Sequence, residues 1–271
     1  MSDSNFLSQC TRFDHTFDGV THPVFVTGSG PPLILLHELD GFNVPFIKLA
    51  ERFSCEFTVY APLLYGSVGQ PEAKTKFGQL IDGFRGYWCM RRELSFLATG
   101  RTGVIAGWTR HLAERVSRES EGRSVGIVGM CMTGGLVLAT IAHPAIGAGV
   151  SAQPSLPLAM SVLGTMRRRQ DFGLSPDEVG AINQTQTPLL TLRFSGDRIC
   201  PEERISQMAK QIPHMQGPPE FLNGVCDHPT LTACFRHEPK AGAAEASEEA
   251  IAATITFLTE HLDHAKDEPR S

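Results

Sequence analysis

Two hydrophobic patterns alternate along the chain: short, mainly apolar runs, and segments in which apolar residues recur every three or four positions. The runs predict buried strands at 33–37, 57–60, 125–128, 148–150, 189–194 and 221–222. The periodic segments predict helices at 44–53, 104–116, 136–142 and near the C-terminus through 251–262. Strands that alternate with helices in this way predict an α/β fold, with a mainly parallel central sheet and helices on both faces.

One helix start can be recognised from local chemistry. Ser175-Pro176-Asp177-Glu178 combines a capping serine, a proline at the first helical position and a glutamate three residues on. We therefore expect a helix to begin there. The stretch 75–120 has helical texture, but its pattern is regular only in its second half.

Composition narrows the classes of protein. The chain has 271 residues, 41% hydrophobic and 20% charged, without a repeat or linker, so we expect one domain over 1–271. A net charge of −5 argues against a nucleic-acid partner. A polar N-terminus and the lack of long apolar runs predict no signal peptide and no membrane segment. The default expectation is a monomer.

The cysteines point to a reducing compartment. Seven are scattered through the chain without a CxxC pair, which favours free thiols and a cytoplasmic location. Their spacing matches no zinc template, so no metal is expected, and no motif indicates a cofactor.

The segment that carries chemistry is Val128-Gly129-Met130-Cys131-Met132-Thr133-Gly134-Gly135. It reads G-x-C-x-x-G-G between a predicted strand and a predicted helix, and is related to the nucleophile elbow G-x-S-x-G. Small residues on either side let strand and helix pack closely beneath a strained nucleophile. The backbone N–H of Met132 would then face the developing oxyanion, and the positive end of the following helix would favour a thiolate. The alternative is that Cys131 is a buried packing residue, as free cysteines often are.

A thiol nucleophile needs a base and a group that orients the base. Asp197 follows the strand 189–194, where a triad acid is expected, although an aspartate there can also serve only as a turn or cap residue. His228 follows the predicted last strand and is the preferred base. His237, nine residues further on, is its competitor.

Together these residues resemble the dienelactone hydrolase family of α/β-hydrolases. The resemblance runs from His37-Glu38-Leu39-Asp40-Gly41 through Tyr60-Ala61-Pro62-Leu63-Leu64-Tyr65-Gly66 and the Cys131 elbow to the loops of Asp197 and His228. It implies that Glu38 contacts the thiol and takes part in its activation. It also implies that the backbone N–H of Leu39 supplies the second oxyanion donor.

The match to the family pattern is incomplete in two places. The family has an aspartate where this chain has Leu63. Its substrate-binding arginines cannot be aligned residue by residue; Arg91, Arg92 and Arg236 are candidates, and surface solvation is the alternative for each.

These features predict a hydrolase that cleaves small-molecule esters or lactones of the dienelactone type. Cys131 attacks the carbonyl, His228 and Asp197 move and orient the proton, and a thioester intermediate is hydrolysed. One rival is a catalytically silent hydrolase-fold protein that binds a small ligand or a protein partner. Another is a thiol redox protein, which the lack of a CxxC pair disfavours.

Overall fold

The computed structural model describes residues 8–38, 41–66, 68–70, 103–155, 169–194, 197, 200–217, 231–235 and 242–263. Within these ranges the strands are β1 (Thr11–Phe17), β2 (Val20–Thr27), β3 (Pro32–Leu35), β4 (Phe42–Asn43), β5 (Thr58–Pro62), β6 (Val68–Gln70), β7 (Val125–Met130), β8 (Ile146–Ala152) and β9 (Leu189–Leu192). The helices are α2 (Val44–Phe53), α4 (Val104–Glu119), α5 (Met132–Thr140), α7 (Pro176–Thr185), α8 (Glu202–Gln211) and α9 (Ala243–Asp263), with a 3₁₀ turn at Ala233–Phe235.

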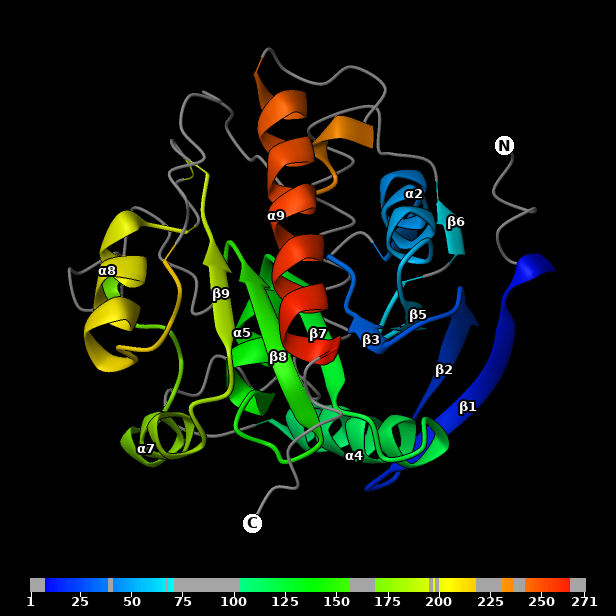
Figure 1. Cartoon of the computed structure of the whole chain (residues 1–271), viewed down its shortest axis with the longest axis horizontal. Helices are drawn as coiled ribbons and strands as arrows, with labels where there is room; N and C mark the ends of the chain where they lie inside the picture. The colour runs from blue at the N-terminus through cyan, green and yellow to red at the C-terminus, as the bar shows by residue number, and fades with distance from the viewer. Residues whose placement is uncertain are drawn as a thin grey trace.

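The main sheet of the described chain has seven strands in the order β1-β2-β5-β3-β7-β8-β9 (Figure 1). From β5 to β9 all neighbours are parallel, whereas β1 pairs with β2 and β2 with β5 in antiparallel fashion. The predicted mainly parallel α/β sheet is therefore confirmed. The carboxyl ends of β3, β7, β8 and β9 lie at one edge, where ligand sites of such sheets are found.

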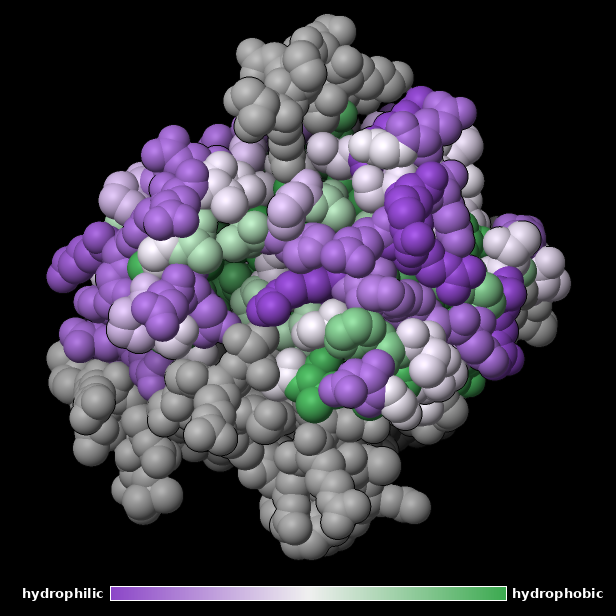
Figure 2. All heavy atoms as spheres, turned by 90° about the horizontal axis from the view of Figure 1, so that it is seen from below, coloured by the Kyte–Doolittle hydropathy of each residue, from purple (hydrophilic) through white to green (hydrophobic). Residues whose placement is uncertain are grey.

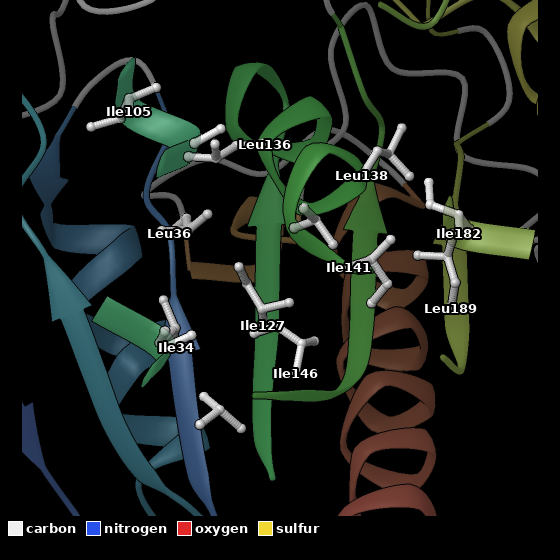
Figure 3. Packing of buried hydrophobic residues seen from close by; sticks show 14 of the residues in the cluster. Ile34, Leu36, Ile105, Ile127, Leu136, Leu138, Ile141, Ile146, Ile182 and Leu189 are labelled. Atoms are coloured by element: carbon white, nitrogen blue, oxygen red, sulfur yellow. The ribbon is translucent and has the colours of Figure 1, made fainter. Parts of the chain in front are cut away.

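Alternate residues of the parallel strands feed two separate cores. Leu33 and Leu35 of β3 pack with residues of α2 and α9, while Ile34 and Leu36 point to the other face. That second cluster includes residues of α4, α5, α7 and α8, and Figure 3 shows several of its aliphatic side chains interlocking between the sheet and α5. Helices thus cover both faces, as the alternation of apolar runs and amphipathic segments predicted.

Local chemistry sets several helix ends. Ser175 accepts from the Glu178 N–H and the Glu178 carboxylate accepts from the Ser175 N–H, so the predicted capping box is confirmed. Asn43 caps α2 by accepting from the Phe46 N–H at 2.9 Å. Such caps are each worth about 1 kcal/mol.

The structure differs from the predicted elements in two regions. The N-terminal hairpin of β1 and β2 was not predicted, and its turn is Asp18-Gly19 with both φ angles positive. Helix α5 begins at Met132 rather than near 136, because the chain turns directly from β7 into the helix. The predicted strand at 221–222 lies outside the described residues.

The face at the amino ends of the strands is mainly hydrophilic where the structure describes it (Figure 2). In the described part of the chain, Val104 is the exposed large hydrophobic residue. None of the helices in the described ranges is long and apolar enough to cross a membrane.

Candidate active site

Cys131 sits on a sharp turn between the last residue of β7 and the first residue of α5. Its backbone has φ 54° and ψ −114°, a region that residues other than glycine rarely adopt. Strain of this kind costs about 1–3 kcal/mol and persists only where the surroundings enforce it. The predicted strand–turn–helix elbow is therefore present around this cysteine.

Two glycines of the motif, Gly129 and Gly134, lie in close packing. A Cβ on Gly129 would lie 2.4 Å from the carbonyl oxygen of Thr133, inside contact distance. A Cβ on Gly134 would lie 3.0 Å from the Ala152 oxygen and 3.1 Å from the Pro154 Cα. A side chain at Gly129 would therefore force the elbow apart, and one at Gly134 would crowd the contact between α5 and the end of β8.

The sulfur of Cys131 lies among polar groups from three parts of the chain. The Ser155 hydroxyl is 3.3 Å from the sulfur, and the Met132 N–H donates to it. Burial raises the pKa of Cys131 to about 12, and the negative charges of Glu38 and then Asp197 act in the same direction. The expected stabilisation of a thiolate by the helix end is therefore outweighed. At neutral pH the resting group is a thiol.

Glu38 is buried at the carboxyl end of β3, close enough to the sulfur for its charge to raise the thiol pKa. The neighbouring His37 fixes this loop. Its Nε2 accepts from the Leu64 N–H at 3.0 Å, so its Nδ1 carries the proton and donates to the Glu38 carbonyl oxygen at 2.6 Å. Complete burial lowers the pKa of His37 to about 4. With both nitrogens engaged, His37 is a structural support rather than a base.

Asp197 lies after β9 at the same edge of the sheet and is buried. Its Oδ1 accepts from the Cys200 N–H at 3.1 Å, which tightens the turn that leads into α8. Helix α8 itself begins later, with Pro201 at the N-cap, so Asp197 is a turn residue and not a helix cap. Its charge also acts on Cys131. Asp197 is therefore a turn residue and also a charged group near the sulfur.

The structure brings together Cys131, Met132, Glu38 and Asp197 of the predicted site. The other predicted residues lie outside the described ranges: the base His228 and its competitor His237, the oxyanion donor Leu39, and the candidate arginines Arg91, Arg92 and Arg236. In the described ranges no group of three His, Cys, Asp or Glu side chains could hold a metal ion.

Sequence reasoning named no single residue of the segment that follows β8 as part of the site. Ser155, from this segment, contacts the sulfur. Gln153 is fully buried with φ 36°, and neither of its amide atoms has a partner in the described structure. Each such polar group costs about 1–3 kcal/mol. Strain and unmet hydrogen bonding are thus concentrated beside the nucleophile. The only sequence signal was that these residues follow a strand at the carboxyl edge.

Comparison with known families decides the assignment. The model of the dienelactone hydrolase family matches residues 22–262. The chain belongs to the dienelactone hydrolase family. It is accordingly a hydrolase, as the elbow and the order of the site residues predicted. No curated protein matches the sequence significantly.

Solved structures show that this family member has the α/β-hydrolase fold. A dienelactone hydrolase-like promiscuous phosphotriesterase from metagenomic libraries is 16% identical with a TM-score of 0.58, covering 92% of this chain and 98% of that one. A protein of Klebsiella pneumoniae subsp. pneumoniae MGH 78578 assigned as a dienelactone hydrolase is 15% identical with a TM-score of 0.56, covering 91% and 98%. A cold-adapted esterase from an Arctic intertidal metagenomic library is 15% identical with a TM-score of 0.52, covering 94% and 95%.

Proposed function

We propose that this hydrolase cleaves carboxylic esters or lactones of the dienelactone type, as a carboxymethylenebutenolidase-like enzyme, with Cys131 as its nucleophile. The observation that carries the proposal is the backbone of Cys131, held at φ 54° at the tip of β7 beside glycines that lie in close packing. A cysteine kept only for packing needs no such strained position. In the family to which the chain belongs, this is the position of the nucleophile.

The first chemical step begins from a neutral thiol. His228, oriented by Asp197, accepts the thiol proton, and Glu38 assists by its position beside the sulfur. The thiolate forms a C–S bond to the ester carbonyl, and the carbonyl electron pair moves to oxygen. The backbone N–H groups of Met132 and Leu39 stabilise that oxyanion. Collapse of the tetrahedral intermediate expels the alkoxide or enolate, which takes the proton from His228.

The second step returns the enzyme to its starting state. Water, deprotonated by His228, attacks the thioester carbonyl, and the sulfur leaves as a thiolate that recovers its proton. A thioester is readily formed from activated esters, whose leaving groups are stable enolates or phenolates. Amides should be poor substrates because their leaving groups are far more basic.

The high pKa of Cys131 fits activation by the substrate rather than a permanently charged thiolate. The buried charge of Glu38 opposes a second negative charge nearby. A substrate that displaces Glu38 or neutralises it would remove part of this opposition. A protected thiol of this kind is less open to oxidation between turnovers.

The direct test compares hydrolysis of p-nitrophenyl acetate and of a dienelactone by the wild type, Cys131→Ser and Cys131→Ala. We expect turnover to be lost in both variants while the fold, measured by circular dichroism, is kept. Full activity in Cys131→Ala would exclude this nucleophile. Lack of activity on either substrate in the wild type would favour the ligand-binding alternative, to be followed by thermal-shift screening with small carboxylates and esters.

A further inference from the structure

Ser155, which is not part of the predicted site, places its side chain at hydrogen-bonding distance from the Cys131 sulfur. Its hydroxyl oxygen lies 3.3 Å from the Cys131 sulfur, although 24 residues separate them in the chain. Ser155 is 1% exposed and Cys131 is 9% exposed, so bulk water does not compete strongly for this contact. The two groups form a buried polar pair at the carboxyl edge of the sheet.

The backbone holds this serine in register with the nucleophile. The Ser155 N–H donates to the Cys131 carbonyl oxygen at 3.0 Å, and the Cys131 N–H donates to the Ala152 oxygen at 3.0 Å. Between them, the Pro154 oxygen accepts from the guanidinium of the buried Arg204 at 2.8 Å. These three bonds fix both ends of the segment against the elbow. The backbone therefore holds the two residues side by side, within reach of a contact between their side chains.

The chemistry of the pair changes when the thiol loses its proton. In the thiol state either group can donate, because a hydroxyl and a thiol each carry one hydrogen. A thiolate can only accept, so the Ser155 O–H becomes the donor. Hydrogen bonds to an ionised partner are roughly twice as strong as those between neutral groups. The contact therefore stabilises the thiolate more than the thiol.

Several other described groups around the sulfur oppose a thiolate rather than stabilise it. Glu38, Asp197 and the second buried thiol, Cys200, are acids whose charged forms would repel a thiolate. The Met132 N–H donates to the sulfur at rest. In the proposed mechanism that N–H turns to the oxyanion of the substrate. The serine hydroxyl is then a donor that stays with the sulfur, beside the protonated His228 of the proposed mechanism.

We propose that Ser155 positions the Cys131 sulfur and donates a hydrogen bond to the thiolate as it forms, keeping its own proton throughout. The proton that leaves the sulfur goes to the histidine base, so the serine is neither acid nor nucleophile. This role rests on the proposed function for its meaning in turnover, but the contact itself can be tested on the thiol alone.

The experiment measures alkylation of Cys131 by iodoacetamide between pH 7 and 10, mapped by mass spectrometry, in wild type, Ser155→Ala and Ser155→Thr. We expect alkylation of Cys131 in Ser155→Ala to be slower by about tenfold at each pH, because the thiolate has lost a charge-assisted donor. Ser155→Thr, which keeps the hydroxyl, should recover most of the rate. p-Nitrophenyl acetate turnover should fall in kcat more than it changes in KM.

Ser151→Ala is the matched control. Ser151 is also a buried serine near the end of β8, but its hydroxyl donates to the Gly134 carbonyl oxygen at 2.9 Å and not to the sulfur. Its alkylation profile should follow the wild type. If Ser155→Ala does not fold, Ser155→Gly tests the same loss of the hydroxyl.

An unchanged alkylation rate and pH profile in a folded variant without the hydroxyl would overturn the proposed role. So would an equal change in Ser151→Ala. If turnover survives in Cys131→Ala, the proposed function fails, whereas the alkylation result still decides whether Ser155 stabilises this thiolate. The two failures are thereby distinguished.

Discussion

Cys131 and Cys200 are two buried thiols at the same edge of the sheet, and burial raises the pKa of each to about 12. Their surroundings differ. Cys131 has a strained backbone and retains 9% exposure, and its sulfur shares a hydrogen bond with the Ser155 hydroxyl and accepts one from the Met132 N–H. Cys200 is fully buried, and its backbone N–H is bound by Asp197. A raised pKa therefore does not identify a nucleophile; the donors around the sulfur and the access to it do.

Replacing Cys131 and Cys200 separately should give the largest difference in activity between the two thiols. We expect Cys131→Ala to lower kcat/KM for p-nitrophenyl acetate by on the order of a thousandfold or more. Cys200→Ala should retain activity within about threefold and lose only about 1–2 kcal/mol of stability, as a small buried residue does. Turnover and chemical denaturation of the two variants check this. Equal losses of activity would abolish the distinction between the thiols.

The packing beneath the elbow can be tested with two glycines of one motif. Gly129→Ala places a Cβ 2.4 Å from a backbone oxygen and should cost about 3 kcal/mol or more. Gly135→Ala meets nothing within 4 Å and lies inside α5, so it should be neutral or stabilise by about 0.5–1 kcal/mol. Urea denaturation measures both. A Gly129→Ala protein as stable as Gly135→Ala would contradict the crowding that defines the elbow.

The pH dependence of alkylation separates the thiols by access. Because the pKa of Cys131 is raised to about 12, the thiol is protonated at neutral pH, and its thiolate fraction grows as the pH rises. Its alkylation should therefore increase about tenfold per pH unit from 7 to 9. Alkylation of Cys200 should depend on pH in the same way but be far slower, because this buried thiol must first be exposed. A plateau for Cys131 below pH 8 would show a thiolate already formed at rest.

Replacing Glu38 should give the smallest of these effects, and the one most specific to Cys131. Its charge acts on Cys131 and is not among the groups that shift Cys200. Glu38→Gln should therefore lower the pKa of Cys131 alone and speed its alkylation by between about three- and tenfold. Turnover should fall at the same time if Glu38 assists activation. Glu119→Gln, on the exposed part of α4, is the control and should change neither rate. Faster turnover in Glu38→Gln would remove that assisting role.

The parallel core was predictable because its strands are buried on both faces. Residues such as Ile127 and Leu190 lie in short, mainly apolar runs whose residues are all buried. The hairpin of β1 and β2 was missed because polar residues interrupt its pattern, although Asp18-Gly19 between two strands is a recognisable hairpin turn. The start of α5 was missed because Gly134 and Gly135 have low helix propensity.

The site was predictable only in part. Cys131 and Asp197 could be selected as candidates because each follows a predicted strand, in the chain order nucleophile and then acid. Glu38 came from the family resemblance. Ser155 could not be found, since its contact with the sulfur joins residues 24 positions apart and depends on the turn after β8. The high pKa of the Cys131 thiol could not be predicted from the sequence either. It arises from burial and from charges that only the fold brings together.

The central claim, that Cys131 forms the acyl-enzyme, is tested most directly by trapping that intermediate. The enzyme is mixed with excess p-nitrophenyl acetate, quenched in acid within the first turnovers, and digested for peptide mass spectrometry. Acetylation of Cys131 that rises and decays at the rate of turnover is the predicted result. Turnover without any acetyl group on Cys131, or with the acetyl group on another side chain, would contradict it.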